Sequence, residues 1–98
     1  MWRIKADKRK RVIQTLLLHV RHIPPDEAVL ALRDAYIKVA NQVGCAREKF
    51  VGDPSNLELI KQELGEGWRR ISLENLHYCI ITCAKNAENY GGDWKTNV

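Results

Sequence analysis

Residues 25–44 read PDEAVLALRDAYIKVANQVG and form the clearest helical pattern in the chain. Pro25 suits the first turn of a helix, and the acidic Asp26 and Glu27 complement the positive end of the helix dipole. Gly44 is typical of the position just after a helix C-terminus. The apolar side chains between these signals fall on two stripes: Val29, Leu32, Tyr36, Val39 and Val43, then Leu30 and Ile37. A helix that is apolar over such a wide arc is expected at the centre of the fold.

Shorter helical patterns lie on both sides of this central helix. We predict helices over residues 7–22 and 56–64, and a short helical turn over residues 45–51. A last helix is expected after the N-cap Ser72, and Gly91-Gly92 should end it. No sustained alternation of apolar and polar residues predicts a strand.

The 98 residues are therefore expected to form a single helical domain, residues 1–98. Its fold class is all-α, a small antiparallel bundle of four helices, or of five if the short turn is counted. The basic N-terminal segment of this domain covers residues 1–11, and a flexible C-terminal tail covers residues 93–98.

The composition describes a small basic protein. Sixteen lysines and arginines against twelve aspartates and glutamates give a formal net charge of +4, which allows some attraction to polyanions. The three cysteines are an odd number at irregular spacing, which argues against a disulfide framework. No segment approaches the ~20 apolar residues of a membrane span, and the N-terminus lacks the apolar core of a secretion signal. We expect a cytoplasmic protein with no membrane contact.

The N-terminal segment concentrates positive charge in a short stretch. Its basic residues are Arg3, Lys5, Lys8, Arg9, Lys10 and Arg11, the candidate nucleic-acid-binding residues of the chain. Such a cluster can neutralise several phosphates, and the adjacent Trp2 can stack on an exposed base. The alternative is a solvated helix start, although cations in a first helical turn oppose the helix dipole.

A second basic cluster, Trp68-Arg69-Arg70, follows a glycine-containing loop. Tryptophan and arginine are common at the energetic centres of protein interfaces. Trp68 either fills the core or stands exposed as an anchor, and the sequence leaves both interpretations open. If Trp68 is exposed, these three residues are the candidate protein-binding patch.

The segment VANQVGC, residues 39–45, has the small residue, the apolar residue and the turn glycine of a helix-turn-helix. Phe50 would then pack the recognition helix. However, Gly52 and Pro54 interrupt that helix before it could present enough side chains to bases. We therefore favour a helix with an ordinary glycine cap, followed by an irregular loop.

Cys79 and Cys83 share one face of the last predicted helix and could reach one metal ion. His77 points to another face, and structural zinc sites usually have two close ligand pairs. Two small buried hydrophobic residues are the simpler interpretation. His19 and His22 neighbour each other without a nucleophile or carboxylate at a catalytic spacing. We expect no metal, no cofactor and no catalytic residue.

These patterns favour a small non-catalytic accessory or regulatory protein that binds another protein. The alternative is a nucleic-acid-binding protein that uses its basic N-terminal segment. A small enzyme has the least support. Self-association into a homodimer would cover the apolar arc of the central helix, and a purely monomeric mass in sedimentation would contradict it.

Overall fold

The computed structural model describes residues 6–44 and 47–95, with the side chains of residues 6–10 and 47–48 excluded. Five α-helices and two 3-10 turns make up these residues, and no strand occurs among them. The elements are α1 (Ala6–His19), α2 (Pro25–Val43), α3 (Arg47–Val51), α4 (Pro54–Leu64), η1 (Glu66–Trp68), α5 (Leu73–Lys85) and η2 (Ala87–Asn89). The predicted all-α fold class is confirmed.

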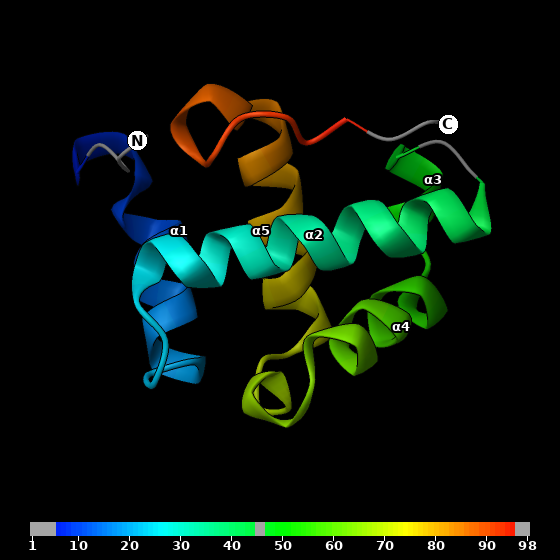
Figure 1. Ribbon diagram of the computed structural model, residues 1–98, viewed down its shortest axis with the longest axis horizontal. Helices are drawn as coiled ribbons and strands as arrows, with labels where there is room; N and C mark the ends of the chain where they lie inside the picture. Colours follow the sequence, from blue (N-terminus) through cyan, green and yellow to red (C-terminus); the bar gives the residue numbers. More distant parts are fainter. Residues whose placement is uncertain (1–5, 45–46, 96–98) are drawn as a thin grey trace.

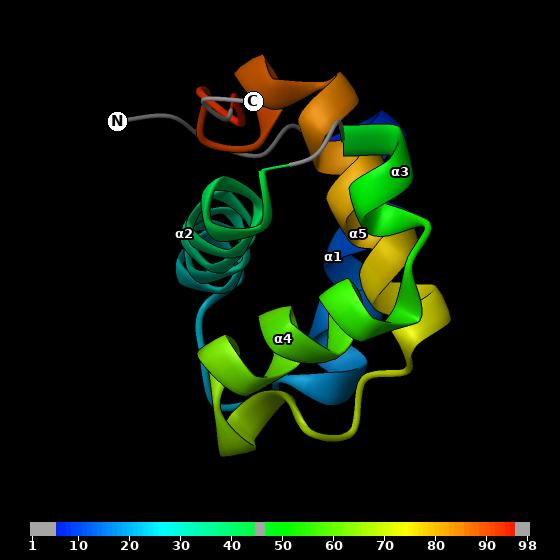
Figure 2. The ribbon, with the colours of Figure 1, turned by 90° about the vertical axis from the view of Figure 1, so that its right-hand side faces the viewer.

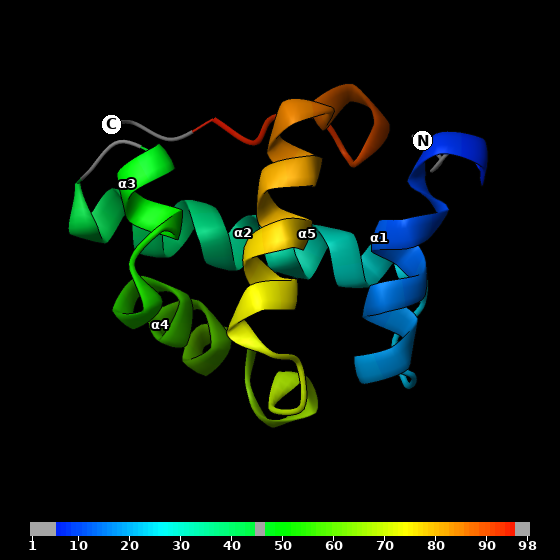
Figure 3. The ribbon, with the colours of Figure 1, turned by 180° about the vertical axis from the view of Figure 1, so that it is seen from behind.

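Two antiparallel helix pairs cross each other in this fold. Figures 1 and 3 show α1 beside α5, running in opposite directions, and α4 returning beside α2. Figure 2 views α2 along its axis, with α1 and α5 on the other side of the molecule. The sequence-adjacent helices α1 and α2 therefore cross, whereas we predicted antiparallel neighbours. Because α2 is apolar over a wide arc, it contacts α1, α3, α4 and α5 in turn.

Local signals end most helices where the sequence predicted. Gly44 follows α2 in the left-handed conformation (φ 73°, ψ 35°), and its N–H donates to the carbonyl of Ala40. Ser72 caps α5, since its hydroxyl accepts from the N–H of Asn75 at 3.1 Å. Two helices are shorter than predicted: α1 ends at His19 and α5 ends at Lys85.

The core gathers on the inner face of α2. Tyr36 lies at its centre, with the Phe50 ring edge-on at 5.8 Å and the Trp94 ring tilted at 6.0 Å. The buried residues of α2 are Ala28, Val29, Leu32, Ala35, Tyr36, Val39 and Ala40. Helices of the same chain cover these residues, whereas Val43, on the same predicted apolar stripe, is 41% exposed. Among the described residues, no helix is long and apolar enough to cross a membrane.

We predicted a flexible C-terminal tail over residues 93–98. In the structure, however, Trp94 of this segment packs into the core. Trp94 is only 2% exposed, and its indole Nε1 donates to the carbonyl of Tyr90 at 2.8 Å. Burial of the large indole orders the chain up to this residue, because an indole buries more apolar area than almost any other side chain. Residues 96–98 of the predicted tail lie outside the described residues.

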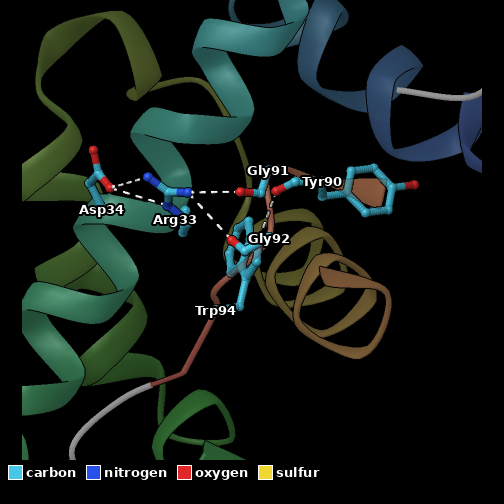
Figure 4. Close-up of polar contacts among 6 residues, drawn as sticks. All are labelled: Arg33, Asp34, Tyr90, Gly91, Gly92 and Trp94. Carbon is cyan, nitrogen blue, oxygen red and sulfur yellow. Dashed lines mark hydrogen bonds and ion pairs between the residues drawn. The ribbon is translucent and has the colours of Figure 1, made fainter. Parts of the chain in front are cut away.

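Arg33 on α2 holds the turn that precedes Trp94 (Figure 4). Its Nη1 donates to the carbonyls of Gly91 and Gly92 at 3.1 and 3.4 Å. The carboxylate of Asp34 lies 3.3 Å from the same guanidinium group. Arg33 is therefore a structural cation that fastens the C-terminal segment to α2.

Candidate functional site

A pocket of about 380 Å³ lies between two segments that are far apart in the sequence. Both segments run along the lower edge of the molecule in Figure 1, at the opposite end of α1 from its start. The lining residues are Leu18, His19, Arg21, His22, Glu66, Gly67, Arg69 and Arg70. This volume falls within the ~300–1,000 Å³ of typical small-molecule pockets.

Local backbone features bring the two segments together. The first segment is the end of α1 and the turn that follows His19, and the second is η1 with the two residues after it. Trp68 anchors the second segment, because its side chain is buried beneath the exposed Arg69 and Arg70. A Cβ atom at Gly67 would lie only 2.7 Å from Cε1 and Nε2 of His22. Glycine at position 67 therefore lets the His22 ring close against the backbone of η1.

The pocket carries an excess of positive charge. Three guanidinium groups, those of Arg21, Arg69 and Arg70, line it with one carboxylate among the described residues, that of Glu66. Glu66 lies 3.5 Å from Arg69, and both side chains are at least three-quarters exposed. Water screens such an ion pair, so it holds the Arg69 side chain only weakly.

Arg21 and Arg70 are available for a ligand. Neither forms a hydrogen bond or an ion pair with another residue that the structure describes. His19, on the inner side of the pocket, lies 3.5 Å from the side-chain amide of Asn75 on α5. The pocket can therefore offer two unengaged guanidinium groups to an anion.

A further cation and an aromatic ring lie toward the start of α1. Arg11 is exposed, and its guanidinium carbon lies 5.9 Å from the ring centroid of Tyr78 on α5. Tyr78 is 37% exposed. Since α1 rises ~1.5 Å per residue, about 12 Å separates Arg11 from His19 at the pocket.

Most of the predicted N-terminal candidates lie outside what the structure describes. Arg3 and Lys5 precede the described residues. Lys8, Arg9 and Lys10 belong to α1, but their side chains are outside the description. Arg11 is thus the one member of this cluster whose side chain is described.

The structure decides between the two interpretations of Trp68. Its side chain is 2% exposed and belongs to the core, so it cannot serve as an exposed anchor. Arg69 and Arg70, which we predicted beside it, are exposed and line the pocket instead. Of the patch predicted for a protein partner, Arg69 and Arg70 are therefore on the surface, whereas Trp68 is buried.

Neither the helix-turn-helix nor the cysteine pair forms a site in the described residues. Phe50 is buried, as a packing residue of a recognition helix would be, but α3 has only five residues and is too short for such a helix. Cys79 and Cys83 are both buried, and burial raises the pKa of the Cys79 thiol from its ordinary 9.0 to about 12. Burial, together with the neighbouring Cys79, raises the pKa of Cys83 as well. No three metal-ligating side chains gather among the described residues.

Sequence reasoning missed Arg21 and Gly67 as parts of a site. Arg21 stands between two histidines in HVRH, residues 19–22, and Gly67 precedes WRR, residues 68–70. The signal available in the sequence was the presence of two short clusters of basic side chains, one of which also contains two histidines. Only the tertiary structure shows that they face the same pocket.

Comparisons of the chain with protein family models, with curated proteins and with solved structures gave no match. A functional proposal therefore depends on the side chains of the pocket and on the adjoining face of α1.

Proposed function

We propose that this protein binds nucleic acid through its phosphate groups, and that it acts by binding rather than by catalysis. The observation that carries the proposal is the convergence of Arg21, Arg69 and Arg70 on one pocket. Guanidinium groups present planar forks of N–H donors that match phosphate oxygens. The net charge of +4 adds a general attraction to polyanions.

The face of α1 supports a path for a strand beyond the pocket. Arg11 and Tyr78 lie about 12 Å away along the helix, a distance that equals three to four nucleotides at the ~3.4 Å axial rise of one strand in duplex DNA. The partly exposed ring of Tyr78 offers a surface on which a base can stack. Lys8, Arg9 and Lys10 precede Arg11 in the chain and extend the basic run at this end.

Fluorescence anisotropy with labelled single-stranded and duplex oligonucleotides, at low and at physiological salt, tests the proposal. The pocket variant is Arg21→Gln/Arg70→Gln. The control, Lys49→Gln/Lys95→Gln, removes two exposed cations from α3 and from the C-terminal segment. For single strands, each phosphate contact contributes ~0.7 to the slope of log K against log salt. We expect the pocket variant to flatten this slope by about 1.4 and the control to leave it nearly unchanged.

A further variant, in which alanine replaces Lys8, Arg9, Lys10 and Arg11, tests how much the N-terminal segment contributes to the affinity for nucleic acid. We expect it to weaken binding further at every salt concentration. Absence of binding at low salt would refute the proposed function. If the pocket variant and the control lose affinity equally, binding depends on net charge alone. The pocket would then not be part of the nucleic-acid interface.

Protein binding is the second candidate function, and the exposure of one leucine favours it. Leu18 at the pocket is 63% exposed, and Leu17 beside it is 38% exposed. An apolar side chain beside arginines suits an interface with an acidic partner. Leu18→Ser should then weaken capture of that partner from a nuclease-treated lysate. Capture that does not change in this variant would count against an interface at Leu18.

A further inference from the structure

The charge of the pocket matches a terminal phosphate better than a bridging one. Three guanidinium groups against the single carboxylate of Glu66 leave two positive charges among the described lining residues. A phosphate that bridges two nucleotides carries one negative charge, whereas a phosphate monoester carries ~1.5 to 2 near pH 7. A terminal monoester would therefore balance the pocket, and a bridging diester would leave it with excess charge.

The free arginines provide the donors that such a group requires. Arg21 and Arg70 come from different segments and are not engaged with other described residues. A monoester has three terminal oxygens, so it can accept from two guanidinium forks at once. A bridging phosphate presents fewer free oxygens to the same donors.

His22 and Gly67 form one part of the pocket lining. The His22 ring occupies the space next to Gly67 and joins the turn after α1 to η1. The volume of about 380 Å³ leaves room for one nucleotide rather than for a longer segment.

We propose that this pocket binds the terminal phosphate monoester of a nucleic-acid strand whose preceding nucleotides follow α1 toward Arg11. This inference rests on the proposed function and specifies which part of the nucleic acid the pocket takes. In this arrangement Arg21 and Arg70 contact the terminal phosphate, and Gly67 allows His22 to close the pocket behind it.

Anisotropy measurements with short single-stranded probes of one sequence test this inference. The probes carry a 5′-phosphate, a 3′-phosphate or no terminal phosphate, with the dye at the other end. We expect a phosphate at one of the two ends to tighten binding about tenfold. Arg21→Gln and Arg70→Gln should each remove most of this gain, and Lys95→Gln should retain it. Circular dichroism confirms that each variant is folded.

The outcomes separate this inference from the proposed function. Equal affinity for all three probes would overturn the terminal-phosphate site while leaving nucleic-acid binding intact. A gain that persists in both Arg21→Gln and Arg70→Gln would place the phosphate elsewhere and also overturn the inference. A mononucleotide that displaces the phosphorylated strand at a similar concentration would assign the pocket to free nucleotides. Failure of every probe to bind would refute both proposals.

Discussion

Replacement of Trp94 by alanine should destabilise this protein strongly, although only four residues follow it in the sequence. The indole is 2% exposed and packs against Tyr36. Changing a buried tryptophan to alanine costs ~3–5 kcal/mol, because the apolar contacts are lost and a cavity remains. For a domain of about 100 residues, each kcal/mol shifts the Tm by roughly 4–8 °C. We therefore expect the Tm to fall by at least ~12 °C.

Thermal unfolding followed by circular dichroism measures this effect, with two matched variants. Trp94→Phe retains a ring against Tyr36 but removes the Nε1 donor to the Tyr90 carbonyl, so it should cost less, with about 1 kcal/mol of the loss due to that hydrogen bond. Lys95→Ala changes the adjacent exposed residue and should leave the Tm within ~2 °C of the wild type. A Tm for Trp94→Ala that matches that of Lys95→Ala would refute the reasoning and restore a loose tail from residue 93.

Two other predictions concern ionisation and backbone conformation. Because burial raises the pKa of Cys79 to about 12 and also raises that of Cys83, the unfolded chain loses its thiol protons first as the pH rises above 9. The free energy of unfolding should then fall as the pH rises from about 9 to 12, because the unfolded chain releases thiol protons that the folded chain retains. In the variant Cys79→Ala/Cys83→Ala, urea titrations at several pH values should show a smaller decrease in the free energy of unfolding with pH. A decrease equal to that of the wild type would contradict the burial of the thiols. Gly65→Ala should lower the free energy of unfolding by ~1–3 kcal/mol, because Gly65 has φ 94° and ψ −173°, a region that other residues avoid. An unchanged urea midpoint would show that the loop relaxes without strain.

The site followed only partly from the sequence. Arg69 and Arg70 were predicted, together with Trp68, as a candidate protein-binding patch, and the structure places both arginines in the lining of the pocket. Their expected aromatic partner, Trp68, is in the core, because an isolated tryptophan in a loop carries no periodicity to show which way it points. Arg21 had no predicted role, since nothing near it in the sequence indicates which segment it will face.

The sequence by itself determined the helical class and most helix ends. These features depend on contacts between residues three or four apart and on caps such as Ser72 and Gly44, so a short window of sequence contains them. The structure alone decided that α2 crosses α1, that Trp94 closes the core, and that the segments at Arg21 and Arg70 share a pocket. Those outcomes depend on packing between residues that are distant in the chain, and a local pattern of apolar and charged residues does not specify it.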